Sequence, residues 1–243
     1  MKIDDVHISV YGLILARGHR HDILPTVDNK FVTVPGKSGA YKGSSRFGTR
    51  VFSLPLVFLE KKPIDLEEKI RDFADKFTDF SGKIKEIKIQ FDYEDVWYTA
   101  SIDGDLTPAR INGVGEFALN LIAYDPFAYG LEKTYDFINN QVTLQNIGTA
   151  NAFPVFNVTF TASATEFKVL LGDKFVRVIR NFVVGDQLVI DSKTRKIIYN
   201  NLINMPLLDL KSRWFELVPG ENIMSVTPIN VANVEVTFQE RWL

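Results

Sequence analysis

The residue types that most often carry out chemistry are scarce in this chain of 243 residues. It has no cysteine, and all of its histidines lie near the N-terminus, at His7, His19 and His21. The missing cysteines exclude a thiol nucleophile, a thiolate metal site and a disulfide framework. A Ser–His–acid triad would have to use one of these histidines, and no Gly-x-Ser-x-Gly turn is present to hold its serine.

His19 and His21 have a spacing that could serve a metal ion. Residues two apart on a strand lie on the same face, so the pair could hold a metal together with Asp22. Arg17 and Arg20 stand beside them, and their positive charge opposes a cation. A polar surface turn is therefore the preferred interpretation, and neither a metal nor a cofactor is expected.

Two glycine-containing segments match parts of nucleotide-binding motifs. Pro35-Gly36-Lys37-Ser38 resembles the end of a phosphate-binding loop, but Phe31 occupies the position of the first glycine and no apolar helix follows. Gly113–Ala118 spells a dinucleotide fingerprint, but the residues after it alternate as a strand, whereas the phosphate needs a helix N-terminus. Both segments are therefore interpreted as turns.

The tightest cluster of acids lies directly before two aromatic residues. Asp92, Glu94 and Asp95 precede Trp97 and Tyr98. Paired carboxylates can hydrolyse a glycosidic bond, and an aromatic ring can hold a sugar. Because the cluster falls between two predicted strands, a solvated turn is preferred over a glycosidase site.

Tryptophan rings give a second, non-enzymatic route to sugar recognition. Trp97 and Trp214 are kept as weak candidates for sugar platforms, for an alternative function as a carbohydrate-binding module. Trp214 and Trp242 lie among apolar neighbours, which favours packing in a core or an interface over an open platform.

The composition is that of a globular chain, with 46% hydrophobic and 24% charged residues. The net charge of −2 disfavours a dedicated nucleic-acid binder. No apolar stretch approaches the ~18 residues that a membrane span needs, and Asp4 and Asp5 stand where a signal peptide would be positive. We expect a cytoplasmic chain with no membrane insertion, unless it leaves the cell as part of something larger.

The sequence predicts one helix, over about residues 65–80. Asp65 and Glu68 have capping-box spacing, and Gly82 supplies a stop. Apolar residues recur at steps of three and four and form one stripe, at Leu66, Ile70, Phe73, Phe77 and Phe80.

Most of the remaining sequence alternates with period two, which predicts antiparallel strands. Strands within residues 83–91, 97–102 and 115–124 would form a sheet backed by the helix. Beyond Asp125–Gly130, short strands between turns predict a β-sandwich of ~100 residues. The fold class is therefore mainly β, with an α+β N-terminal domain over residues 1–133 and a β-sandwich over residues 134–243.

Residues 30–59 predict a long β-hairpin arm, because alternating apolar ends flank a glycine-rich middle. No acidic residue occurs from Asn29 to Leu59. The candidate interface residues of this arm are Lys30, Phe31, Val34, Lys37, Lys42, Arg46, Arg50 and Phe52. The helix that follows is acidic, and its candidate counter-surface for the arm is Asp72, Asp75 and Asp79.

The order and spacing of several segments carry a resemblance to a known family. The segments are Val34–Gly39, the acidic helix, Tyr124–Phe127, Gly148–Phe156, Leu188–Asp191, Trp214 with Leu217–Asn222, and Glu240-Arg241-Trp242. With these features the chain resembles the distal tail protein (Dit) family of bacteriophages with long non-contractile tails and of related prophages.

The resemblance implies a structural role and no enzyme activity. It implies a homo-hexameric ring at the virion tail tip, assembled in the host cytoplasm through a hairpin belt at residues 30–59, with a galectin-like sandwich outside. The implied partners are the tail tube protein, a tail-associated fibre or lysin protein and receptor-binding proteins, with DNA only passing through a central channel. Sugar-binding galectins use a histidine-containing motif that residues 134–243 lack, so the resemblance carries a galectin's fold and not its lectin site.

We expect the basic arm of one subunit to lie against an acidic surface of its neighbour. Exposed ion pairs contribute only ~0–1 kcal/mol each. The charges would therefore set register and encounter rate, while the apolar ends of the arm would supply affinity.

Overall fold

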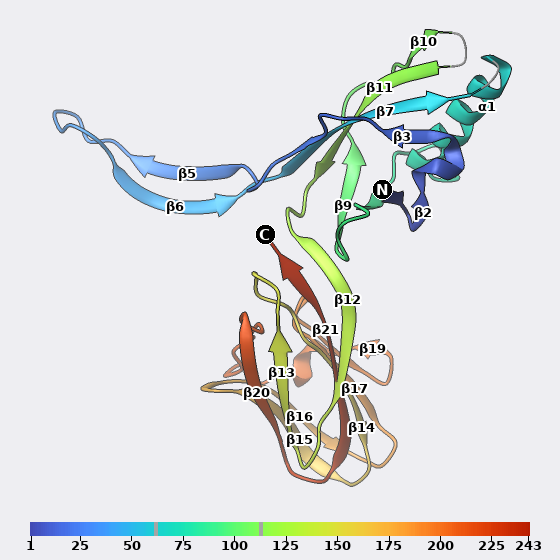
Figure 1. Cartoon of the computed structure of the whole chain (residues 1–243). Coiled ribbons are helices and arrows are strands. Elements are labelled where there is room, and N and C mark those ends of the chain that lie inside the picture. Colours follow the sequence, from blue (N-terminus) through green and yellow to red (C-terminus); the bar gives the residue numbers. More distant parts are fainter. Residues whose placement is uncertain (61–62, 112–113) are drawn as a thin grey trace. The chain divides into compact units, whose positions relative to one another are not determined.

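The computed structural model describes residues 1–60, 63–111 and 114–243. These residues form two compact units, and each is described here by itself. Unit 1 comprises Met1–Ala128 together with Leu243, and unit 2 comprises Tyr129–Trp242. Both are built mainly from antiparallel strands (Figure 1). Within the described part of the chain, no helix has the length and apolar character needed to cross a bilayer.

Unit 1 is a strand-rich domain with one α-helix, α1 (Pro63–Ala74), and two 3-10 helices, η1 (Ile8–Tyr11) and η2 (Asp75–Phe77). Its strands are β1 (Lys2–Ile3), β2 (Val6–His7), β3 (Leu13–Leu15), β4 (Arg20–His21), β5 (Val27–Val32), β6 (Tyr41–Phe47), β7 (Arg50–Leu59), β8 (Ile87–Gln90), β9 (Trp97–Ile102), β10 (Ala109–Ile111) and β11 (Val114–Ala123). Strand β7 pairs with β11 on one side and with β3 and β4 on the other. Strand β11 also pairs with β9 and β10, and β8 joins β9 to β1.

The core of unit 1 lies on one face of the β7–β11 ladder. Phe52 pairs with Leu121, Leu54 with Leu119, and Leu56 with Phe117, and all six side chains are buried. Residues directly opposite each other on antiparallel strands share a face, so the two alternating sequences make one apolar surface. The strand that follows Gly113 thus holds the residues of the apparent dinucleotide fingerprint, while Gly113 itself lies outside the described residues.

Helix α1 covers this surface through the predicted stripe, although the stripe ends early. Leu66, Phe73 and Phe77 are buried, and the Phe73 ring centroid lies 6.1 Å from that of Phe58. Asp65 lies inside the first turn of the helix and does not cap it. The chain leaves the helical conformation at Thr78, so Phe80 falls in a turn and is fully exposed, contrary to its predicted place in the stripe.

Unit 2 is a sandwich of two sheets. Its strands are β12 (Ala128–Asp136), β13 (Gln141–Asn146), β14 (Val155–Phe160), β15 (Ala164–Leu171), β16 (Lys174–Phe182), β17 (Gln187–Asp191), β18 (Lys196–Tyr199), β19 (Leu202–Ile203), β20 (Gly220–Thr227) and β21 (Ala232–Trp242), with one 3-10 helix, η3 (Met205–Leu207). One sheet has the order β19-β18-β17-β14-β21-β12 and the other β13-β20-β15-β16. The last strand, β21, pairs with β14 inside the sandwich.

The sandwich core is dense in aromatic side chains. Phe160 and Phe182 stack with ring centroids 4.1 Å apart, and the ring of Phe167 meets that of Phe160 edge-on at 5.6 Å. All three side chains are almost completely buried. The alternation seen in the sequence therefore corresponds here to one buried and one solvated face on each strand.

Candidate oligomer interface

Strands β5 and β6 form a two-stranded ribbon, which stands apart from the β7–β11 ladder of unit 1 in Figure 1. Val27 pairs with Phe47 at its base and Val32 with Tyr41 near its tip. At the tip, the Lys37 N–H donates to the Val34 carbonyl at 3.1 Å, and Gly36 and Gly39 have positive φ angles. The segment that resembles part of a phosphate-binding loop is therefore the turn of a hairpin. We call residues 27–47 the arm.

The arm is exposed along its whole length. Every residue from Val27 to Phe47 is exposed. The large apolar side chains among them are Val27, Phe31, Val32, Val34, Tyr41 and Phe47. Isolated two-stranded hairpins are at best marginally stable in water, so an apolar ribbon of this kind gains from a covering surface.

The cations of the arm differ in how they are engaged. Arg46 donates to Asp28 at 2.9 Å, and Lys37 bonds the Tyr41 hydroxyl and lies over its ring. Lys30 and Lys42 are exposed and have no ion-pair partner among the described residues. Two of the predicted arm lysines are therefore available for contact with another chain.

Two predicted interface residues lie elsewhere. Arg50 and Phe52 belong to β7 and are buried, with exposed fractions of 2% and 0%, so neither is part of the exposed arm. The Arg50 guanidinium donates to the carbonyls of Pro126 at 3.0 Å and Asp22 at 2.7 Å. The alternation of residues 50–59 fits a core strand as well as one strand of an exposed hairpin. The pairing of β7 with β11 shows that residues 50–59 form a core strand.

The predicted acidic counter-surface lies at the end of the helical segment. Asp72 on α1 and Asp75 on η2 are exposed. Asp79 lies in the turn beyond, where its carboxylate accepts the Ser81 hydroxyl at 2.7 Å and the Lys83 N–H at 2.9 Å. These hydrogen bonds lower the pKa of the Asp79 carboxyl from its ordinary value, so Asp79 already has a local role.

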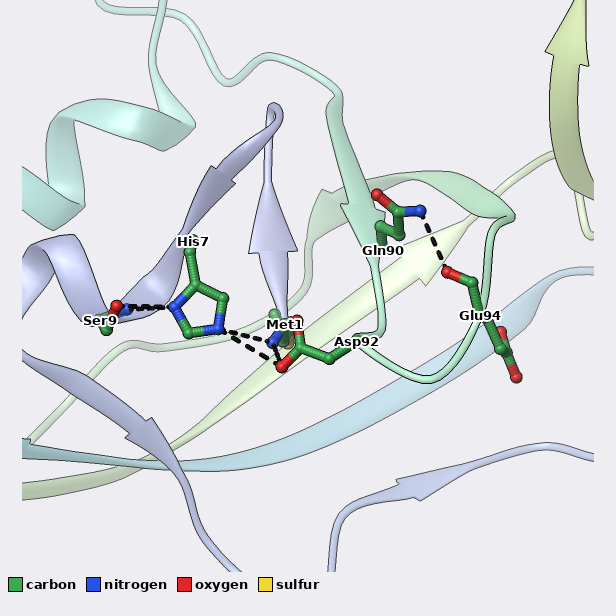
Figure 2. A network of polar contacts seen from close by, with 6 residues as sticks. All are labelled: Met1, His7, Ser9, Gln90, Asp92 and Glu94. Atoms are coloured by element: carbon green, nitrogen blue, oxygen red, sulfur yellow. Dashed lines mark hydrogen bonds and ion pairs between the residues drawn. The ribbon is translucent and has the colours of Figure 1, made fainter.

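The carboxylates before Trp97 do not form a paired acid site. Asp92 forms an ion pair with the N-terminal amine of Met1, whose side chain is buried, and lies 3.4 Å from His7 Nε2 (Figure 2). The amine hydrogen bond is the main cause that lowers the pKa of the Asp92 carboxyl. Gln90 bonds the backbone carbonyl of Glu94, whose side chain points away from Asp92 in Figure 2. Asp92 is therefore engaged in a local network with the N-terminus and not in a pair with Glu94.

The side chains of the other candidate chemical sites are also in contact with neighbouring side chains. The rings of His19 and His21 stack at 6.0 Å, and no group of three or more potential metal ligands occurs in the described part of the chain. Lys88 lies 4.0 Å from the ring centroid of Trp97, and Trp214 packs against the sandwich core. The glycan-binding alternative, with Trp97 and Trp214 as its platforms, stays a prediction.

Two buried asparagines in unit 2 were missed by the sequence reasoning. Asn222 donates to the carbonyls of Val218 and Gly220 and accepts the Val218 N–H, which locks the turn before β20. Asn146 bonds the carbonyls of Ala150 and Leu217. The sequence offers one clue for each residue: Asn146 ends a run of alternating strand residues, and Asn222 closely follows the turn signal Pro219-Gly220. Backbone groups at such turns need hydrogen-bond partners, and an asparagine side chain can supply them.

Comparisons with known proteins identify the family. One family model, described as a phage tail protein RIFT-related domain, matches residues 6–123. A second, described as a siphovirus-type tail component, C-terminal domain, matches residues 147–242. Together the two models span most of the chain and fall on unit 1 and unit 2 respectively.

A relative and a solved structure agree with these matches. The distal tail protein of Bacillus phage SPP1 is 36% identical over 130 residues, which are 51% of this chain and 50% of that protein, so the match spans half of that relative. The crystal structure of SPP1 Dit, described as a paradigm of the hub adsorption apparatus in phages that infect Gram-positive bacteria, has a TM-score of 0.81 at 20% identity. The structural match covers 99% of this chain and 98% of the SPP1 Dit chain, and it confirms the predicted mainly β fold. The chain belongs to the distal tail protein family of phage tail components.

Proposed function

We propose that the protein is a structural hub component of a phage tail tip. In this proposal six copies form a ring that joins the tail tube to the tail-associated fibre or lysin protein, around a channel through which DNA passes. Receptor-binding proteins are further candidate partners at the outer surface. Family membership supports a role in tail architecture rather than in catalysis.

The observation that carries the ring is the exposed arm. All residues of the ribbon are exposed, six of them have large apolar side chains, and two of its lysines have no ion-pair partner among the described residues. This is the composition of a surface that is buried on assembly. An arm that contacts a different patch on the next copy makes a head-to-tail interface, and repetition of such an interface closes into a ring when the rotation allows it.

Removal of the arm tests this function. Val27 and Phe47 face each other across the base of the ribbon, so a short Gly-Ser linker can replace residues 28–46 without pulling β4 and β7 apart. Light scattering and native mass spectrometry over a range of concentrations should give a hexamer for the full chain and a monomer for the shortened chain. Because the removed residues are exposed, the thermal unfolding of the two units should be unchanged.

Two outcomes would overturn the proposal. One is a hexamer of the shortened chain with the stability of the full chain, which would remove the arm from assembly. The other is a full chain that remains monomeric at every concentration and also when mixed with purified tail tubes.

A further inference from the structure

The turn from Thr78 to Ile84 holds a phenylalanine completely in solvent. Phe80 has a relative exposure of 114%, and Ile84, the bridge partner of Thr78, is 66% exposed. Around Phe80 the backbone is fixed on both sides, because Asp79 N–H donates to Lys83 O at 2.8 Å and Gly82 N–H to Asp79 O at 2.9 Å. The turn is a short closed loop rather than a frayed helix end.

The Asp79 carboxylate adds a second layer of order to this turn. Its Oδ1 atom accepts the N–H of Ser81 at 2.8 Å, the hydroxyl of Ser81 at 2.7 Å and the N–H of Lys83 at 2.9 Å. Ordering a loop on binding costs free energy, and a loop that is already ordered avoids that cost. A large aromatic side chain on such a loop has the properties of an interface anchor.

A hollow of about 250 Å³ lies beside the exposed ring. It is lined by Asp75, Lys76, Thr78, Asp79, Phe80 and Lys85. Lys85 forms an ion pair with Asp4 at 3.2 Å, and Lys76 lies 5.7 Å from the ring centroid of Tyr11. The Asp75 carboxylate has no hydrogen-bond or ion-pair partner among the described residues. The turn therefore offers one aromatic ring and, next to it, one unengaged negative charge.

The arm carries the complementary pair. Phe31 on β5 is the cross-strand partner of Lys42 on β6, so their side chains lie next to each other on one face of the ribbon. Phe31 is 66% exposed, and the Lys42 ammonium has no partner among the described residues. The strand register thus places one aromatic ring beside one unengaged positive charge.

We propose that the turn of one copy receives the arm of a second copy, with Phe31 packed against Phe80 and Lys42 seated in the hollow beside Asp75. This inference rests on the proposed ring and deepens it by naming both halves of the contact. A second copy is favoured over another tail protein because a single chain supplies both matching pairs, ring to ring and cation to anion. The ring pair supplies affinity, and the charge pair sets the register.

Charge reversal tests the polar half of the contact. Lys42→Glu and Asp75→Lys should each raise the concentration needed for half-assembly by about tenfold or more, as expected for a central interface pair. The double variant should recover most of the loss, because it restores opposite charges. Lys196→Glu, which makes the same charge change on an exposed residue of unit 2, is the control and should assemble like the wild type.

Phe80→Ser tests the apolar half. Its matched control is Leu210→Ser, since Leu210 is 101% exposed on another turn that an aspartate orders, where Asp209 accepts the Lys211 N–H at 3.0 Å. Phe80→Ser should weaken assembly by about tenfold or more, and Leu210→Ser should not. Thermal unfolding should be the same for both variants, because neither side chain is packed within its own unit.

A photo-cross-linker identifies the occupant directly. Benzoylphenylalanine in place of Phe80 in the assembled full chain should give covalent dimers whose linked peptide falls within residues 27–47 of the other copy. This contact is overturned, and the ring is retained, if the wild type forms a ring and the Phe80→Ser and Asp75→Lys variants assemble equally well. The same conclusion follows if the cross-link falls outside residues 27–47 or joins only a different tail protein. A wild-type chain that never assembles overturns the ring and the contact together.

Discussion

Two antiparallel hairpins of this protein have opposite environments. In β15–β16 of the sandwich, Phe167 pairs with Val178 and Val169 with Val176, and all four side chains are fully buried. In β5–β6 of the arm, every residue is exposed. Both hairpins satisfy their backbone hydrogen bonds in the same way, so strand pairing does not explain the difference. What differs is a second sheet, which covers β15–β16 and is lacking for the arm within its own unit.

The distribution of apolar residues in the two hairpins also differs. Strand β15 alternates between buried and more exposed positions, which matches a single covered face. The arm has apolar pairs on both faces, with Val27 and Phe47 on one and Val32 and Tyr41 on the other. A ribbon that is apolar on two sides fits a segment enclosed by other chains better than one laid on a single sheet.

The largest expected contrast comes from truncating one phenylalanine in each hairpin. Phe167→Ala should lower the free energy of unfolding of unit 2 by about 3–5 kcal/mol, because it leaves a cavity beside Phe160. Phe31→Ala should change the stability of the monomer by less than about 0.5 kcal/mol. Denaturant unfolding at protein concentrations too low for assembly measures both free energies of unfolding. Equal losses of stability in the two variants would contradict the comparison.

Two asparagines test the same contrast for hydrogen bonds. Asn222→Ala should cost about 1–3 kcal/mol, because Asn222 is buried and its loss leaves the groups of Val218 and Gly220 unsatisfied. Asn29 of the arm accepts the Ser45 hydroxyl at 2.6 Å, but both are exposed, so water can replace that bond. Asn29→Ala is the control, with an expected change within about 0.5 kcal/mol in thermal unfolding of the monomer.

Two glycines that lie close to the backbone of a neighbouring strand test whether a substitution destabilises a whole unit or only the arm. A Cβ on Gly148 would overlap the backbone of Arg241, so Gly148→Ala should destabilise unit 2 by about 1–3 kcal/mol. A Cβ on Gly43 would lie 2.7 Å from the Lys30 carbonyl oxygen, so Gly43→Ala should loosen the arm alone. Hydrogen exchange should show faster exchange throughout unit 2 for the first variant and only in residues 27–47 for the second.

The smallest expected effect is a pH response of the Phe80 turn. Hydrogen bonds lower the pKa of Asp79, so its stabilising contribution is present above the ordinary aspartate pKa and is lost as the pH falls through the lower, folded value. In an NMR titration, the amides of Ser81 and Lys83 should move only in that acidic range. Asp79→Asn should abolish this step, and a step at the ordinary pKa of an exposed aspartate would show that the carboxylate is not engaged.

Local patterns in the sequence were sufficient for much of the fold. The strands, the buried part of the helix stripe and the existence of a hairpin arm follow from periodicities that depend on a few neighbouring residues. The same patterns failed at the ends of elements. Phe80 continues the helical spacing but lies beyond the point where the chain turns away. Residues 50–59 alternate like an arm but form a core strand that is paired on both sides.

The candidate interface shows the same division. The sequence by itself determined which residues are apolar or charged in the arm and in the acidic segment, and that the chain has no cysteine and only three histidines. Only the tertiary structure decided that Arg50 and Phe52 are internal, that Met1 engages Asp92, and that Phe31 stands beside Lys42. The physical reason is that burial and cross-strand neighbours depend on which distant segments pair, and periodicity along one chain carries no information about that choice.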